Sequence, residues 1–148
     1  MMNSIIGGII LAMILSGNIT SPDQLPQQVN ATDLQQLSGA MEIENGDNGD
    51  YCLLLTGSVV LNRVYSPHWS GDTIEKVILA KGQYASVTRN GFKTKKAKER
   101  TVLLAKYLLI YGPICPSNVV YQGQGYNGSG LYEKIEVKGQ KPELFCYE

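Results

Sequence analysis

Apolar residues at helical spacing mark the first well-patterned element of the chain. Leu34, Leu37 and Met41 fall on one face of a predicted helix, because residues three and four apart share a side of a helix. Thr32 resembles an N-cap, and we expect the helix to run to about Glu44. The Asn-Gly-Asp-Asn-Gly sequence that follows is typical of a turn and ends the element.

Residues 51–64 are apolar almost all round, which is typical of a buried central helix. β-branched Val59 and Val60 leave a strand as the alternative. The small residues at 56–58 would let another backbone approach closely. Pro67 ends either element, because proline disfavours a helical residue before it.

In the second half of the chain, residue patterns typical of helices are followed by patterns typical of strands. A short helix over 74–79, capped at Asp72-Thr73, and a longer helix over 97–111 are predicted, with strands at 118–122, 131–137 and 144–147. Helices followed by a small antiparallel sheet indicate an α+β fold.

The first thirty residues differ in character from the rest. Residues 5–15 are nearly all apolar but too short to span a bilayer, and they resemble the core of a secretory signal. Residues 1–4 lack the usual Lys or Arg, so an N-terminal helix packed on the domain or on a partner is the alternative. Residues 17–30 have the composition of a linker. We therefore expect a signal-like segment and linker over 1–30 and one domain over 31–148.

Charge and composition narrow the class of protein. Lys and Arg number 13, as do Asp and Glu, and this balance argues against a nucleic-acid binder. With 148 residues and 43% apolar content, the chain can form one globular domain, which we expect to be a monomer without a stable membrane span. Three cysteines allow one disulfide, for which Cys115 and Cys146 are the favoured pair over Cys52. A single histidine, His68, argues against a Cys/His metal cluster.

Two glutamates near the end of the first predicted helix differ in orientation. Glu44 falls about 50° from the centre of the apolar face and Glu42 about 105°, so Glu42 is expected to lean toward solvent. A carboxyl group at the edge of a dry cleft can hold a proton at neutral pH and act as an acid. Asp47 and Asp50 are candidates for a second carboxylate. Arg63 is expected to bond to Glu42 or to backbone, because pairing with Glu44 would lower the pKa of that acid.

Several motifs together resemble a known family. The sequence contains VVLNRVYSP at 59–67, TIEKVI at 73–78 and KGQYASV at 81–87. These resemble the cell-wall hydrolases of the spore-cortex-lytic (SleB-like) type. The far end, with SNVVYQGQ at 117–124, GSGLYEKI and FCY, is similar to a branch found in Gram-positive bacteria and their phages. The likeness extends over about residues 34–147.

This resemblance implies a lysozyme-like helical fold that cleaves the glycan of peptidoglycan. The family carries its catalytic glutamate in an E-A-E-A-G-like stretch, and Glu44 is the matching position. Ile43 and Asn45 depart from that pattern, where the family has small residues. Gln83 and Tyr84, from the GQ-aromatic motif, would line the glycan groove. No metal or organic cofactor is expected.

One carboxyl group is sufficient for a lytic transglycosylase. Glu44 would protonate the leaving oxygen, and its carboxylate would then take the proton of the sugar's own C6 hydroxyl as a 1,6-anhydro ring closes. If another carboxylate faces Glu44, ordinary hydrolysis becomes possible. The alternative function is a wall-binding or virion structural protein that keeps the fold without activity.

Further contacts to the sugar are expected from the first strand and the turn after it. Aromatic rings stack on sugar faces and amides bond to their polar groups, which makes Tyr121, Gln122 and Tyr126 candidate substrate contacts. An ordinary hairpin whose tyrosines cover the core is the alternative. The basic residues within 93–100 are interpreted as a solvated surface. Peptidoglycan strands are the expected partner, with export to the wall or the exterior, or association with a virion.

Overall fold

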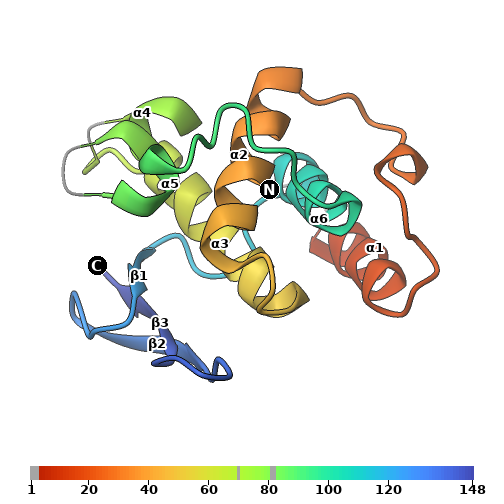
Figure 1. The fold of residues 1–148 in the computed structure, drawn as a ribbon. Coiled ribbons are helices and arrows are strands. Elements are labelled where there is room, and N and C mark those ends of the chain that lie inside the picture. Colours follow the sequence, from red (N-terminus) through yellow and green to blue (C-terminus); the bar gives the residue numbers. More distant parts are fainter. Residues whose placement is uncertain (1–3, 70, 81–82) are drawn as a thin grey trace.

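The computed structural model describes residues 4–69, 71–80 and 83–148, and within them it has an α+β architecture (Figure 1). Six α-helices and a short 3-10 helix precede a three-stranded antiparallel sheet, which confirms the predicted class. The elements are α1 (Ser4–Leu15), η1 (Pro22–Gln24), α2 (Ala31–Asn45), α3 (Asp50–Tyr65), α4 (Ile74–Leu79), α5 (Ala85–Arg89), α6 (Glu99–Tyr111), β1 (Val119–Gly123), β2 (Gly130–Ile135) and β3 (Glu143–Tyr147).

Helix α3 is the central element, as its all-round apolar sequence predicts. Every residue from Cys52 to Arg63 is buried. The helix packs against α2, α4 and α6, and also against β1. The strand alternative for Val59 and Val60 is therefore wrong. An element surrounded by neighbours on all sides needs apolar residues on all sides, which overrides the β propensity of single residues.

Two apolar cores meet at α3. The larger lies among the helices and includes Leu54 and Leu61 from α3. The smaller lies between α3 and the sheet, where Leu55 and Val59 pack with Phe145 of β3. Figure 1 shows the sheet on one side of α3 and helices α1 and α6 on the other. Among the helices, the sheet thus packs mainly against α3.

The small sheet places its last strand in the middle, in the order β1-β3-β2. Strand β3 is antiparallel to both neighbours, with Gln122 of β1 opposite Phe145 and Ile135 of β2 opposite Glu143. Asn62 of α3 anchors the turn before β1, because its Nδ2 donates to the carbonyls of Pro116 (2.8 Å) and Val119 (3.0 Å). The predicted strands are confirmed to within two residues at each boundary.

Two helix boundaries differ from the sequence-based expectation. Asn30, not Thr32, caps α2, and its side chain accepts the Asp33 amide. Helix α5 was not expected, and it begins after Tyr84, whose φ of 41° lies in the left-handed region. Thr73 caps α4 as predicted, by accepting the amide of Lys76.

Residues 4–30 pack on the domain through α6. In α1, Ile14 is fully buried, and Tyr107 of α6 donates its hydroxyl proton to the carbonyl of Gly7 at 2.9 Å. Lys106 Nζ donates to the carbonyls of Pro22 (2.9 Å) and Leu25 (2.6 Å). Residues 17–30 are therefore held against the domain by hydrogen bonds and are not a free linker. None of the described helices is long and apolar enough to cross a membrane.

The favoured disulfide between Cys115 and Cys146 is absent. These two residues and Cys52 are all buried free thiols. Burial raises the pKa of Cys52 to about 12 and that of Cys115 to about 11. The cysteines act here as small apolar residues, and two of them belong to the core beneath the sheet.

The small residues at 56–58 admit side chains rather than another backbone. A Cβ on Gly57 would lie 2.5 Å from Leu108 Cδ1 of α6 and 2.8 Å from Met41 Sδ of α2. Thr56 Oγ1 accepts a hydrogen bond from Asn45 Nδ2 at 2.8 Å, which joins α3 to the end of α2. This contact holds the last turn of α2, and with it the preceding residue Glu44, against the central helix.

Candidate active site

A polar pocket of about 260 Å³ lies where the end of α2, the end of α3, the segment before α5 and the sheet converge. Its lining residues come from all four regions of the chain. They are Glu44, Arg63, Gln83, Tyr84, Tyr121, Gln122, Gly123, Asn127 and Glu143. The pocket therefore joins the helical part of the molecule to the sheet.

Glu44 is half-buried at the edge of this pocket, as the helical-face argument predicts. Its neighbour Asn45 is buried and bonded to α3, so the last turn of α2 is firmly placed. Burial raises the pKa of Glu44 above its ordinary value of 4.5, and the negative charge of Glu143 raises it further. A carboxyl group with a raised pKa is suited to donate a proton near neutral pH.

The walls around Glu44 are more polar than the sequence suggested. The expectation was a dry cleft beside the apolar helix face that carries Leu37 and Met41. Leu37 and Met41 are instead in the main core, and polar side chains line most of the pocket. The sheet and the turn after β1 bring Tyr121, Gln122, Asn127 and Glu143 to this pocket, and no helical pattern could reveal that approach.

Two lining residues carry buried polar atoms without a partner among the described residues. These atoms are the hydroxyl oxygen of Tyr84 and Oε1 of Gln122. Burial raises the pKa of the Tyr84 hydroxyl to about 12; Arg63 opposes this rise and Glu44 adds to it. A neutral hydroxyl can donate and an amide oxygen can accept, so both can bond a polar molecule in the pocket.

Arg63 connects two parts of the pocket wall through hydrogen bonds. It is 4% exposed, its Nε donates to the carbonyl of Val120 at 2.6 Å, and its Nη1 donates to Gln83 Oε1 at 2.7 Å. The prediction that Arg63 bonds to backbone is confirmed, whereas a bond to Glu42 is not found. The guanidinium thus ties α3 to β1 and fixes the side chain of Gln83.

Aromatic rings enclose the same guanidinium. Its central carbon lies 4.2 Å from the ring centre of Trp69 and 5.1 Å from that of Tyr84. Trp69 also meets Tyr121 edge-on, with ring centres 5.7 Å apart. Cations over aromatic faces are attracted by the ring quadrupole, most strongly where water is excluded. Sequence reasoning missed Trp69, because nothing in its spacing from Arg63 signals this contact.

Glu143 is a second carboxylate in the pocket and was also missed. It begins β3, and its Oε1 accepts a hydrogen bond from Gln122 Nε2 at 3.1 Å. The sequence pointed instead to Asp47 and Asp50, which are nearer to Glu44 in the chain. Strand pairing within the sheet places Glu143 in the pocket with Glu44, and a single short strand gives no signal of that pairing.

The two predicted second carboxylates point away and bind basic residues. Asp47 lies 2.9 Å from Lys98 Nζ, and this hydrogen bond and charge lower its pKa. Asp50 is held by Arg100 through two bonds, at 3.0 Å and 2.5 Å. Lys93 likewise pairs with Glu75. The basic segment 93–100 is therefore partly committed to ion pairs with the domain, rather than being solvated throughout.

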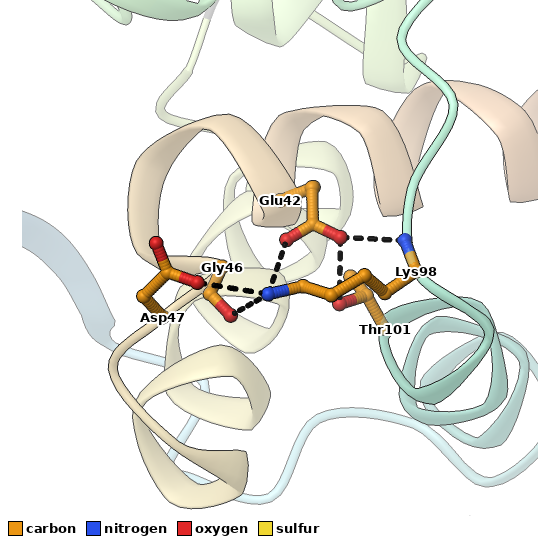
Figure 2. A network of polar contacts seen from close by, with 5 residues as sticks. All are labelled: Glu42, Gly46, Asp47, Lys98 and Thr101. Atoms are coloured by element: carbon orange, nitrogen blue, oxygen red, sulfur yellow. Dashed lines mark hydrogen bonds and ion pairs between the residues drawn. The ribbon is translucent and has the colours of Figure 1, made fainter.

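Glu42 does not lean toward solvent as predicted, and its side chain is only 8% exposed (Figure 2). Its Oε1 accepts the backbone amide of Lys98 at 2.6 Å and the hydroxyl of Thr101 at 3.3 Å. Lys98 Nζ lies 3.7 Å from Oε2. The helical wheel failed because the chain after α5 crosses this side of α2 and covers it. Glu42 has a structural role at the start of α6.

The other candidate residues divide into two groups. Gln83, Tyr84, Tyr121 and Gln122 line the same pocket as Glu44. Tyr126 lies outside it and is 76% exposed. Among the described residues, no group of three His, Cys, Asp or Glu side chains is arranged as a metal site would require.

Residues 53–113 match the model of a family described as Cell Wall Hydrolase. The match supports the resemblance to the cell-wall hydrolases that the sequence motifs indicate. It covers about two fifths of the chain, from α3 to the end of α6, and includes Arg63, Gln83 and Tyr84. Glu44 and the sheet lie outside the matched segment. No curated protein and no solved structure gives a significant match.

Proposed function

We propose that this protein cleaves the glycan strands of peptidoglycan as a lytic transglycosylase, with Glu44 as the acid and then the base. The observation that carries the proposal is the half-buried Glu44 carboxyl, whose pKa is raised, in a polar pocket that the family segment helps to form. Cell wall hydrolases act on the wall, so we place its action there, reached by export or from a virion.

The reaction begins with the proton on Glu44. That proton passes to the glycosidic oxygen as the bond from this oxygen to the sugar's C1 breaks. The resulting Glu44 carboxylate then takes the proton of the C6 hydroxyl, whose oxygen attacks C1 of the same sugar. The products are a new chain end and a 1,6-anhydro sugar, and Glu44 is again protonated.

Two features of the pocket support a sugar substrate. The Tyr84 hydroxyl and Gln122 Oε1 offer a donor and an acceptor that no described residue satisfies, and sugars carry both hydroxyl and amide groups. Arg63 fixes Gln83 and packs against Tyr84, so this wall of the pocket is preorganised. Preorganised polar groups stabilise a transition state without reorganising at the moment of reaction.

Glu44→Gln tests the proposal against the non-catalytic alternative. Wild type, Glu44→Gln and the surface control Glu136→Gln are incubated with purified peptidoglycan, and the released muropeptides are separated and weighed by mass spectrometry. We expect Glu44→Gln to lose about 10²- to 10⁴-fold of the release rate, the usual contribution of a general acid. Glu136 pairs with Lys134 at the surface, so its variant should match wild type.

Each alternative has its own result. Wild type that binds peptidoglycan but releases no fragment would make this a wall-binding protein. Fragments without any anhydro ends would leave glycan cleavage standing and overturn the transglycosylase step.

A further inference from the structure

We propose that Glu143 is a second catalytic carboxylate that activates water, so that the site hydrolyses a fraction of the bonds it breaks. This inference rests on the proposed function and deepens it. Glu143 lines the same pocket as Glu44, although it belongs to β3, near the other end of the sequence. Cleavage by water at a glycosidic bond requires a base in addition to the acid.

The orientation of Glu143 is set by its neighbour on β1. Gln122 Nε2 donates to Glu143 Oε1 at 3.1 Å, and β1 and β3 are paired at this point through Gly123 and Leu144. An ionised carboxylate accepts hydrogen bonds at both oxygens, so Oε2 is available to a second donor. A water molecule is such a donor.

The negative charge of Glu143 affects groups outside the sheet. It acts on two groups on different helices, raising the pKa of Glu44 at the end of α2 and that of the Cys52 thiol in α3, in each case after burial. Burial and the charge of Glu143 thus favour the protonated form of Glu44, which is the acid that hydrolysis requires.

The pocket has the size and polarity to hold water beside a sugar. Its volume of about 260 Å³ far exceeds the roughly 10–15 Å³ that one water needs. The unpartnered Tyr84 hydroxyl and Gln122 Oε1 provide further bonds for that water. A polar, roomy site with several partners is the setting in which buried water is stable.

Hydrolysis uses both carboxyl groups. Glu44 gives its proton to the glycosidic oxygen, and the bond from that oxygen to C1 breaks. Water attacks C1 and yields its proton to the Glu143 carboxylate. The products are a new chain end and a free reducing end. Glu143 then releases its proton to solvent and Glu44 regains one, which restores the starting state.

The ratio of anhydro ends to reducing ends in the released fragments tests the inference. We expect both kinds from wild type, with ¹⁸O appearing only in the new reducing ends when the digestion is run in H₂¹⁸O. Glu143→Gln keeps an acceptor for Gln122 but removes the base. It should lower the labelled fraction about tenfold or more while anhydro ends persist. The control Glu136→Gln removes the same charge outside the pocket and should leave the ratio unchanged.

A second variant guards against loss of folding. Glu143→Asp keeps the charge and draws the carboxylate back by one methylene, so the labelled fraction should fall to a value between wild type and Glu143→Gln. An unchanged ratio in a folded Glu143 variant, or wild-type fragments without labelled ends, overturns the inference and leaves glycan cleavage by Glu44 intact. A wild type that releases no fragments overturns the proposed function itself, which is a different outcome.

Discussion

Glu42 Oε1 accepts the backbone amide of Lys98 at 2.6 Å, so a residue of α2 caps the start of α6 (Figure 2). The first amides of a helix have no partner within it, and a side-chain acceptor usually provides one from the adjoining residue. Lys98 provides no such cap of its own. The acceptor instead comes from 56 residues earlier in the chain.

Replacing Glu42 should therefore destabilise the fold without affecting the chemistry. We expect Glu42→Ala to lower the free energy of unfolding by about 0.5–2 kcal/mol, the range for loss of a helix cap. Urea denaturation measures this loss, and exposed Glu136→Ala is the control. Equal stability of the two variants would show that the cap contributes nothing. Peptidoglycan cleavage by folded Glu42→Ala should match wild type.

Glu44→Gln should gain stability at neutral pH. The folded state raises the pKa of Glu44 above its ordinary 4.5, so it binds the proton more tightly than the unfolded state does. The contribution of Glu44 to the free energy of unfolding is then fully present below pH 4.5, and it is lost as pH rises through the folded-state pKa. Glutamine has no such dependence. Thermal melting should show a higher Tm for the variant at pH 7 and no such gain at pH 4, and a lower Tm at pH 7 would contradict burial as the cause.

Arg63→Lys should lower the free energy of unfolding although the positive charge is kept. Lysine has no planar group to lie between Trp69 and Tyr84, and it cannot keep both the Val120 and the Gln83 hydrogen bonds in their present geometry. A buried acceptor left without its donor costs about 1–3 kcal/mol. Chemical denaturation should show a loss of this size. Arg89→Lys, on the exposed face of α5, is the matched control and should stay within about 0.5 kcal/mol of wild type.

Two helical glycines should respond to alanine in opposite directions. A Cβ on Gly39 of α2 would collide with the backbone carbonyl oxygen of Phe92, which cannot swing aside. Gly39→Ala should therefore cost about 1–3 kcal/mol through overpacking. A Cβ on Gly8 of α1 meets nothing within 4 Å, so Gly8→Ala should stabilise by up to about 1 kcal/mol. Parallel unfolding curves of the two variants test this, and a similar effect of both would rule out the close approach.

The thiols should be unreactive until the protein unfolds. All three cysteines are buried and free, and burial raises the pKa of Cys52 to about 12 and of Cys115 to about 11. Thiolate is the reactive form, so a thiol reagent at pH 8 should react slowly with native protein. In denaturant, without reductant, all 3 cysteines should react. A single reactive thiol there would show that the other two cysteines form a disulfide, as the sequence predicted.

Local pattern predicted most of the helices and strands, and it predicted the position of Glu44. Helical spacing in α2 and the apolar run of α3 depend only on neighbouring residues, so they can be read directly from sequence. The orientation of Glu42 could not be, because a distant segment crosses the face that would otherwise meet solvent. The second carboxylate was missed for a similar reason, since Glu143 reaches the pocket only through strand pairing.

Trp69 and the capping of α2 illustrate two further limits. The contact of Trp69 with Arg63 depends on a loop conformation that no spacing rule describes. Asn30 and Thr32 are both acceptable caps, and propensity alone does not choose between them.

The order of the sheet has a consequence for biosynthesis. Strands β1 and β2 are not neighbours, so neither finds its native partner until residues 143–147 have left the ribosome. Without β3 the pocket lacks the wall that carries Gln122 and Glu143 in their final places. Completion of the pocket thus depends on the last strand that the structure describes.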